Sequence, residues 1–272
     1  MSNLPQQHST AVVAPNAQVD PTCTIGPYAV IGPDVRLGPG NVVGSHVVIE
    51  GRTEIGADNR FLTSCAIGGS PQVAGAADHQ GALRIGDRNV FREFVTVHGG
   101  LREPTVIGSE GLFMANAHVA HDCWLSDRVV LANGATLGGH VVLEQGAQVS
   151  GLSAVHQYVR IGPYAFVAGG AMVVQDVPPF CVVQGDRARL AGLNTVGLRR
   201  AGFSEDAIRS LRRAYRTLFY GAGALEERIR DALALADEPH VRTFTAFLRG
   251  GQRGVITTPR RREATAGREA SC

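Results

Sequence analysis

Two histidines, an aspartate and a cysteine fall within six residues of the segment ANAHVAHDCWLSD, residues 115–127. They are His118, His121, Asp122 and Cys123. Imidazole and thiolate groups are common ligands of transition metals. A histidine beside a carboxylate can also act as a general base, because the carboxylate holds the ring and stabilises its protonated form. Since ordinary loops can contain the same residue types in the same order, the surrounding sequence has to distinguish these interpretations.

The composition of the chain limits the classes of protein to which it can belong. The 272 residues carry a formal net charge of +2, which gives no reason to expect nucleic acid or a membrane surface as a partner. The start of the chain lacks the apolar core of a secretory signal, and no apolar run reaches the roughly 18 residues of a membrane span. Five cysteines without paired short spacing favour a reducing setting. We therefore expect a cytoplasmic protein with no membrane insertion.

A large apolar residue recurs at every sixth position along most of the chain. One series runs from Val13 to Ile67, and a second runs from Ile107 to Val173. A period of six fits neither an amphipathic helix nor an alternating strand. It is typical of a parallel β-helix with a triangular cross-section, in which a short strand and a turn form each of the three sides of a coil. The glycine that often follows the large residue is expected at a corner with positive φ.

Two segments interrupt this period, and the cysteines follow it. Residues 69–82 and 99–104 are expected to form loops outside the coils, where binding groups tend to lie. Cys23, Cys65 and Cys123 each precede a periodic position by two residues, which is the inward position for a smaller side chain. We therefore expect these cysteines to pack in the core rather than to bind metal.

The period and its end define the expected domains. An all-β parallel β-helix is expected over residues 10–185, because Pro178 and Pro179 cannot continue a strand ladder. Residues 186–250 are expected to form an α-helical domain, with helices in SEDAIRSLRRAYRTLFY, ALEERIRDALALA and EPHVRTFTAFLRG. Ser204 is expected to cap the first of these helices. The polar and basic residues 251–272 are expected to form a disordered tail.

Residues one coil apart should lie above one another on the same face of a β-helix. A step of 18 residues leads from His121 to Gly139, and the same step leads from Asp122 to His140. One corner of three neighbouring coils is therefore expected to collect a group of polar residues that core packing does not require. The members of this group are His118, His121, Asp122, Gly139, His140, His156 and Gln157.

This group is compatible with two kinds of chemistry. Several imidazoles could bind a metal ion. Alternatively, His121 could act as a general base oriented by Asp122, and the backbone N–H of Gly139 could stabilise an oxyanion during acyl transfer. A metal site gives no particular reason for the glycine, so we expect no metal.

Motifs spread along the chain resemble those of the UDP-N-acetylglucosamine O-acyltransferases that begin lipid A synthesis. The resemblance extends from about Val13 to Arg249. The motifs that carry it are IGDRN (85–89), REFVTVH (92–98), NAHVAHDC (116–123), GGHV (138–141), AVHQYVRIG (154–162), QDVPPF (175–180) and GLRRAGFS (197–204).

The resemblance implies a fold, an activity and an assembly. The β-helix would be left-handed, and three copies of the chain would form a homotrimer with active sites between neighbouring β-helices. The enzyme would move an (R)-3-hydroxyacyl chain from acyl carrier protein to the 3-hydroxyl of UDP-N-acetylglucosamine, without a cofactor. Since acyl carrier protein is acidic, an arginine-rich helix is a candidate docking face, through Arg209, Arg212, Arg213 and Arg216.

The resemblance also implies roles for individual residues. His121 would be the base, Asp122 its supporting carboxylate and Gly139 the oxyanion donor. Gly169 matches the position that measures acyl length, where glycine accompanies long chains. The remaining positions that match substrate-binding positions are His118, His140, His156 and Gln157 at the corner and Asn194, Arg199 and Arg200 near the nucleotide.

Some residues depart from the pattern of this family. The segment VAGAADHQG, residues 73–81, lacks the Asp and Lys that help to hold the sugar, and HGGL replaces HRGT at residues 98–101. Val196 and Ala201 stand where an acidic residue and an arginine are common. A related acyltransferase with a different nucleotide-sugar or amino-sugar acceptor is therefore an alternative. Two further alternatives are a metal-dependent hydrase of the gamma-carbonic-anhydrase kind, which needs three histidine ligands, and an inactive scaffold.

Overall fold

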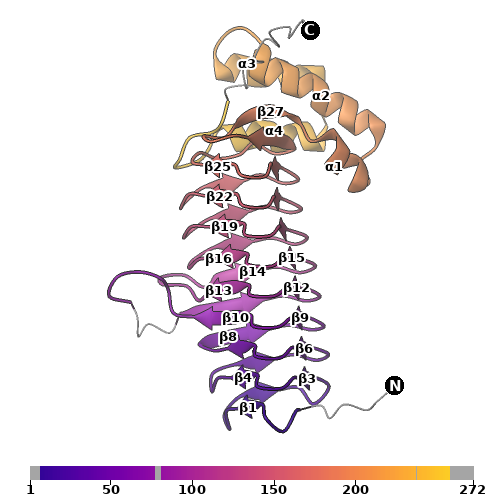
Figure 1. Ribbon diagram of the computed structural model, residues 1–272. Coiled ribbons are helices and arrows are strands. Elements are labelled where there is room, and N and C mark those ends of the chain that lie inside the picture. The colour runs from indigo at the N-terminus through magenta and orange to yellow at the C-terminus, as the bar shows by residue number, and fades with distance from the viewer. Residues whose placement is uncertain (1–6, 77–80, 237, 258–272) are drawn as a thin grey trace, which may run out of the picture.

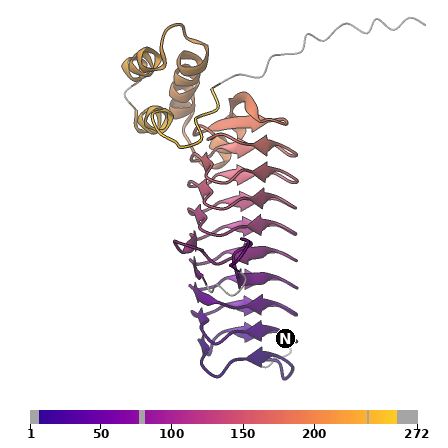
Figure 2. The same ribbon diagram turned by 90° about the vertical axis from the view of Figure 1, so that its left-hand side faces the viewer.

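The chain forms a long solenoid of short strands with a group of helices at its C-terminal end (Figure 1). The computed structural model describes residues 7–76, 81–236 and 238–257. Three sheets run along the solenoid, and successive strands of one sheet come from successive coils. The same coils appear as stacked layers when the molecule is turned by 90° (Figure 2). The expected parallel β-helix is therefore confirmed.

Each sheet occupies one side of the triangular cross-section. The first sheet contains β1 (Val12–Val13), β4 (Val30–Ile31), β7 (Val48–Ile49), β10 (Ala66–Gly69), β13 (Thr96–His98), β16 (His118–Val119), β19 (Thr136–Leu137), β22 (Ala154–Val155) and β25 (Met172–Val173). The second contains β2 (Gln18–Val19), β5 (Arg36–Leu37), β8 (Arg52–Ile55), β11 (Ala82–Ile85), β14 (Thr105–Ile107), β17 (Trp124–Leu125), β20 (Val142–Leu143) and β23 (Arg160–Ile161). The third contains β3 (Thr24–Ile25), β6 (Val42–Val43), β9 (Arg60–Phe61), β12 (Val90–Phe91), β15 (Leu112–Phe113), β18 (Val130–Leu131), β21 (Gln148–Val149), β24 (Phe166–Val167), β26 (Cys181–Gln184) and β27 (Arg189–Leu193).

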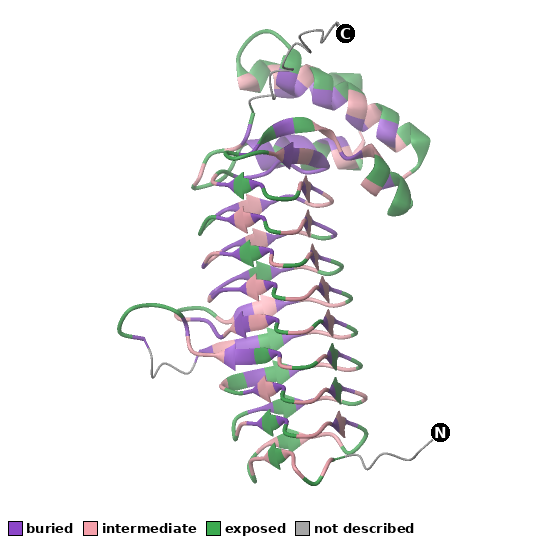
Figure 3. Ribbon diagram, in the orientation of Figure 1, coloured by how far each residue is buried: buried purple, intermediate pink, exposed green. Residues whose placement is uncertain are grey.

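The periodic apolar residues fill the interior of the solenoid, which the burial colouring shows as a repeating pattern along the strands (Figure 3). Phe61, Phe91 and Phe113 stack through three coils, with ring centroids 4.9 and 4.6 Å apart. Cys65 and Cys123 are buried and free, as expected. Burial raises the pKa of the Cys65 thiol to about 11, so this side chain packs as a neutral group.

The expected reason for the periodic glycines holds for Gly68 (φ 85°) but is wrong for the others. Positive φ occurs three residues after the large apolar position, as at Tyr28 and Asp122 (both φ 58°). The glycine directly after that position has a different task, because a Cβ on Gly38 would lie 2.8 Å from the carbonyl oxygen of Gly56 on the next coil. These glycines are therefore required by the close approach of coils rather than by their own φ.

The helical domain contains α1 (Thr195–Arg200), α2 (Glu205–Tyr220), α3 (Leu225–Leu235) and α4 (Pro239–Leu248). The Ser204 hydroxyl accepts a hydrogen bond from Ala207 N–H, which confirms the expected cap of α2. The short helix α1 was not expected from the sequence. No helix in the described part of the chain has the length and apolar character needed to cross a membrane.

The two interruptions of the period lie at the corner that carries the candidate site. Residues 70–76 leave the solenoid after β10, in the projecting loop of Figure 1, and residues 77–80 lie outside the described part. The second interruption, residues 99–104, separates β13 from β14. At the other end, residues 251–257 differ from the expected tail, because Val255 forms a β-bridge with Asp176 and Ile256 is buried. The rest of that tail, residues 258–272, lies outside the described part.

Three buried asparagines form a hydrogen-bonded column in the lower solenoid. Asn59 Nδ2 donates to Asn41 Oδ1, and Asn89 Nδ2 donates to Asn59 Oδ1, each over 3.0 Å. Asn59 Nδ2 also lies 2.9 Å from the carbonyl oxygen of Gly86. Since all three side chains are fully buried, each depends on the next coil for its partners.

Asn59→Ala should lower the free energy of unfolding by about 2–4 kcal/mol, because it leaves buried polar groups of two coils unpaired. Urea unfolding at fixed protein concentration measures this loss. Asn133→Ala is the matched control, since Asn133 is exposed in an outer turn and its substitution should change stability by less than about 0.5 kcal/mol. Equal effects of the two substitutions would contradict a structural role of the column.

Candidate active site

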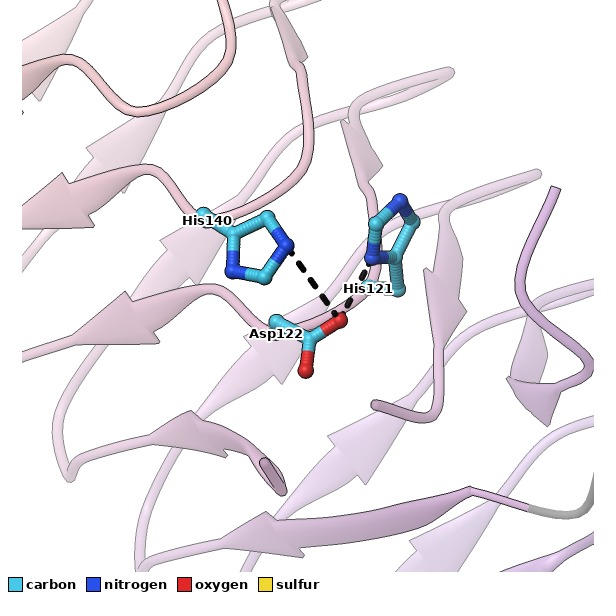
Figure 4. Close-up of side chains that lie close together, drawn as sticks. All are labelled: His121, Asp122 and His140. Carbon is cyan, nitrogen blue, oxygen red and sulfur yellow. Dashed lines mark hydrogen bonds and ion pairs between the residues drawn. The ribbon is translucent and has the colours of Figure 1, made fainter. Parts of the chain in front are cut away.

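His121 and Asp122 lie in the turn between β16 and β17, at the corner where the first sheet meets the second. His121 Nδ1 lies 2.5 Å from Asp122 Oδ2 (Figure 4). The Asp122 side chain is fully buried, whereas the His121 side chain keeps 14% of its surface exposed. The carboxylate thus fixes the ring through Nδ1 and leaves Nε2 as the nitrogen available to a substrate.

The short loop after β13 holds the Asp122 carboxylate. Asp122 Oδ1 accepts hydrogen bonds from the N–H groups of Arg102 (2.8 Å) and Glu103 (2.7 Å), and Oδ2 accepts one from Leu101 N–H (3.0 Å). Burial alone would raise the pKa of Asp122, but the hydrogen bonds from His121 and from these three N–H groups outweigh it and lower the pKa to about 2. Asp122 is therefore ionised at neutral pH and can stabilise a protonated His121.

Gly139 lies directly against the His121 ring. A Cβ at residue 139 would be 2.6 Å from His121 Cε1 and 2.7 Å from Nε2, so only glycine leaves room for this ring position. In other coils the equivalent position can be proline, as at Pro27 and Pro163, because its N–H takes no part in the strand ladder. Within the described residues the Gly139 N–H has no hydrogen-bond acceptor, which suits an oxyanion donor.

His140 completes this cluster from the next coil. Its Nε2 lies 3.8 Å from Asp122 Oδ2, and its ring meets the His121 ring edge to face at 5.3 Å. On the opposite side the ring stacks on Tyr158, with centroids 4.5 Å apart and planes inclined by 9°. Burial lowers the pKa of His140, so it is neutral at pH 7.

His118 lies on the outward face of β16, just before the turn that carries His121 and Asp122. Its Nδ1 is 2.8 Å from Thr96 Oγ1, and its ring meets that of His98 edge to face at 5.1 Å. Burial lowers the pKa of His118. Burial, followed by the nearby His118 and His121, lowers the pKa of His98 to about 4. These rings are therefore neutral, polar walls of the site rather than acids.

Three further residues predicted to bind substrate have open surroundings. His156 and Gln157 are exposed in the turn after β22, where His156 Nδ1 lies 3.1 Å from the carbonyl oxygen of Gln157. Gly169 lies at another corner, in the turn between β24 and β25 where the third sheet meets the first. It is exposed, and a Cβ there would meet only the carbonyl oxygen of Gly151, at 3.5 Å. Residue 169 therefore has room for a larger side chain, as a position that limits acyl length requires.

The three residues predicted near the nucleotide lie elsewhere in the same chain. Asn194 caps α1, since its Oδ1 accepts from Gly197 N–H and its Nδ2 donates to the carbonyl oxygen of Tyr164. Arg199 forms an ion pair with Glu205 at 2.6 Å. Arg200 lines a groove of about 300 Å³ over the third sheet, together with Gln148. The structure does not bring these residues to the His121 corner of the same chain.

The geometry favours a base over a metal site. Ligand atoms of His121, Asp122 and His140 lie within 4.8 Å of one another. However, both Asp122 oxygens already accept hydrogen bonds, and one of them comes from His121 Nδ1. A metal ion would have to break this network. The hydrase alternative also needs a third histidine, and the next candidate, His118, directs Nδ1 at Thr96.

Sequence reasoning missed three contributors to the site. His98 ends the motif REFVTVH but had no predicted role, because the six-residue period slips in the segment that follows it. Tyr158 carried a usable signal, since it lies one step of 18 residues beyond His140. The loop N–H groups that hold Asp122 carry no side-chain signal in the sequence.

The lowered pKa of Asp122 makes a prediction about stability and pH. The ionised carboxylate stabilises the fold above its ordinary pKa of 3.8, and this stabilisation is lost as the pH falls towards 2. Asp122→Asn should therefore lower the free energy of unfolding by about 2 kcal/mol at pH 7 and by almost nothing near pH 2. Urea unfolding across this pH range measures the difference. Asp127→Asn is the control, since Asp127 Oδ1 accepts a single N–H, from Ser109; a loss at Asp122 that does not depend on pH would contradict the argument.

Comparison with known proteins agrees with this geometry. A family model described as UDP N-acetylglucosamine O-acyltransferase, domain 2, matches residues 176–256, and a hexapeptide-repeat transferase model matches residues 16–51. The acyl-[acyl-carrier-protein]–UDP-N-acetylglucosamine O-acyltransferase of Anaeromyxobacter dehalogenans is 49% identical, over 91% of this chain and 98% of the relative. The enzyme of the same name from Herminiimonas arsenicoxydans is 43% identical, over 92% and 98%.

Solved structures lead to the same family. The UDP-N-acetylglucosamine O-acyltransferase of Moraxella catarrhalis superposes with a TM-score of 0.88 at 36% identity, covering 92% of this chain and 99% of that one. The acyltransferase of Francisella novicida gives a TM-score of 0.87 at 32% identity, covering 92% and 93%. These matches span solenoid and helices together and confirm a left-handed β-helix followed by a helical domain. The chain belongs to the family of the UDP-N-acetylglucosamine O-acyltransferases.

Proposed function

We propose that this protein transfers an (R)-3-hydroxyacyl group from acyl carrier protein to the 3-hydroxyl of UDP-N-acetylglucosamine, the first step of lipid A synthesis. The observation that carries this proposal is the His121–Asp122 pair with the Gly139 N–H beside it. The names of the relatives supply the donor and the acceptor. The free cysteines of the described residues support a cytoplasmic location for this reaction.

The residues of the corner support a direct transfer without a cofactor. His121 Nε2 takes the proton of the sugar hydroxyl while its oxygen attacks the thioester carbonyl, and Asp122 stabilises the imidazolium that forms. The Gly139 N–H donates to the carbonyl oxygen as it gains negative charge. When the C–S bond breaks, the protonated His121 returns the proton to the leaving thiolate. One ester bond replaces one thioester bond, and the base is regenerated.

The positions of the predicted nucleotide-binding residues support a shared site in a homotrimer. His121 lies at the corner between the first and second sheets, whereas Arg200 lies over the third sheet, on the opposite side of the triangular cross-section. One chain therefore cannot present both to one small molecule. In a trimer, the third sheet of one copy can face the His121 corner of the next copy, which would bring Arg200 to the nucleotide while Arg199 remains paired with Glu205.

The alternative acceptor is less well supported. The argument for it rests on residues 73–81, of which residues 77–80 lie outside the described part, on HGGL at residues 98–101, and on Val196 and Ala201. Val196 lines the groove beside Arg200, so an acidic contact is indeed missing there. However, relatives at 43–49% identity carry the UDP-N-acetylglucosamine name. An assay with UDP-N-acetylglucosamine beside its 3-amino analogue distinguishes the two acceptors.

His121→Ala should reduce acyl transfer to UDP-N-acetylglucosamine by about 10²–10⁴-fold, because it removes the base. Transfer is measured with purified protein and a series of 3-hydroxyacyl carrier proteins of different chain length. His46→Ala is the matched control, since His46 stacks on Tyr28 in the first coils and lies far from this corner. Size-exclusion chromatography verifies that both variants keep the wild-type assembly. Full activity of the His121 variant would refute the mechanism, and zinc bound at one ion per chain would favour the hydrase.

The arginine-rich face of α2 that we predicted for docking borders a groove in the structure. Arg212 and Arg216 line an open groove of about 690 Å³ between α2 and β27, with Tyr215 and Tyr220. Within the described residues these two arginines have no carboxylate at ion-pair distance, whereas Arg209 pairs with Asp206. Arg212 and Arg216 therefore present unpaired charge at this groove to an acidic carrier protein, and Arg213, exposed on the same helix, has no ion pair within the described residues either.

Arg212→Glu combined with Arg216→Glu should raise the KM for acyl carrier protein by about tenfold or more, and added salt should weaken the wild-type interaction. The kcat at saturating donor and the KM for UDP-N-acetylglucosamine should stay within about twofold. Arg230→Glu, on the exposed surface of α3, is the control of equal charge change per residue. An unchanged KM for the carrier protein would show that α2 is an ordinary solvated surface.

A further inference from the structure

The hydrogen bonds between coils along the active-site corner change above Gln157. Tyr158 N–H donates to the carbonyl oxygen of Gly139 on the coil below. One coil higher, Asp176 N–H would reach Gln157 by the same pattern, but it donates instead to the carbonyl oxygen of Gly254 at 2.8 Å. Asp176 and Val255 form a parallel β-bridge, so the C-terminal segment, rather than the coil below, is the partner of this N–H.

The Asp176 side chain also replaces part of the ladder. In the coil below, Val142 N–H donates to the carbonyl oxygen of Val159. Arg160 N–H instead donates to Asp176 Oδ1, over 2.8 Å. Asp176 is 1% exposed, and burial raises its pKa while the nearby Arg160 and Arg253 oppose that rise. The buried carboxylate therefore replaces a backbone carbonyl oxygen as the acceptor, and it holds the strand that follows the turn with His156.

Residues 251–257, which we call the C-terminal strap, are fixed on Asp176 by several contacts. In Figure 1 the strap is the yellow segment that returns to the top of the solenoid after α4. Ile256 N–H donates to the carbonyl oxygen of Asp176 at 2.9 Å, and the Ile256 side chain is buried. Arg253 Nε reaches the carbonyl oxygen of Val174 at 3.4 Å. Gly251 has φ +130°, and a Cβ there would lie 2.0 Å from Asp176 Oδ2.

A continuous series of contacts joins the strap to the reacting groups. The strap holds Asp176, and Asp176 holds Arg160 N–H, which ends the turn that contains His156 and Gln157. The same turn carries Tyr158, which stacks on His140 beside Asp122. A displacement of the strap would therefore move the turn that lines the acceptor site.

We infer that the C-terminal strap is a positioning element for the nucleotide sugar. Through Asp176, the strap fixes the position of the His156–Tyr158 turn along the solenoid axis. This inference rests on the proposed acyl transfer to UDP-N-acetylglucosamine. The strap does not touch the thioester in this scheme. Displacement of the strap should therefore weaken the binding of the nucleotide sugar more than the binding of the acyl donor.

Gly251→Ala tests this inference, because the added methyl group must displace either the strap or the Asp176 carboxylate. The KM for UDP-N-acetylglucosamine should rise about tenfold, while the KM for acyl carrier protein stays within about twofold. Gly250→Ala is the matched control and should behave as wild type, because nothing lies within 4 Å of a Cβ at residue 250. A merely structural role would lower the amount of active enzyme, and so kcat, without changing either KM; that result would overturn the inference.

A milder variant guards against misfolding. Arg253→Met removes the contact with the Val174 carbonyl oxygen but keeps the backbone bridge between the strap and Asp176. It should raise the KM for the nucleotide sugar about threefold, and isothermal titration of UDP-N-acetylglucosamine should show the same loss of affinity. A chain that ends at Thr257 retains every strap contact given above and should match wild type. Unchanged acceptor affinity in Arg253→Met would overturn the inference, whereas a wild-type enzyme inactive on UDP-N-acetylglucosamine would refute the proposed function instead.

Discussion

The hydrogen-bonded spacing between successive coils is the constraint on which the rest of this structure depends. Parallel strands repeat at about 4.8 Å, so a residue and its counterpart on the next coil are in direct contact. This spacing brings Gly139 against the His121 ring and lets Tyr158 stack on His140. It also forces glycine wherever backbones approach most closely, as at Gly38. The same constraint therefore determines both the packing and the site.

Asp122 connects the regular solenoid with its irregular insertion. Its φ of 58° is the conformation that this turn position adopts in many coils, so no special backbone strain is needed to orient it. Its carboxylate accepts three N–H groups from the loop after β13 and one ring nitrogen from His121. The loop replaces water as the solvent of a buried charge. An insertion that interrupts the sequence period thus makes a buried, ionised partner for the base possible.

The sequence was sufficient for features that follow the period and insufficient for those that depend on its interruptions. A step of 18 residues correctly joined His121 to Gly139 and Asp122 to His140, because coil stacking preserves register. It could not show that loop N–H groups bind Asp122, since backbone donors have no residue code. It also gave Arg199 and Arg200 one shared role, although helix α1 directs the first towards Glu205. Adjacent residues of a helix point in different directions. The direction of each arginine could therefore be assigned only once the bounds of α1 were known.

The order of the sheets separates His121 from the residues predicted near the nucleotide within one chain. The turn with His121 joins the first sheet to the second, and a triangular solenoid always places the third sheet on the far side of that corner. Arg200, which lies over the third sheet, is therefore separated from His121 within one chain, and the proposed trimer would supply it from another copy. At the same time, the strap closes the corner from above and forms a β-bridge with Asp176. The open directions at His121 are therefore sideways, and this is the geometry that the proposed site between subunits requires.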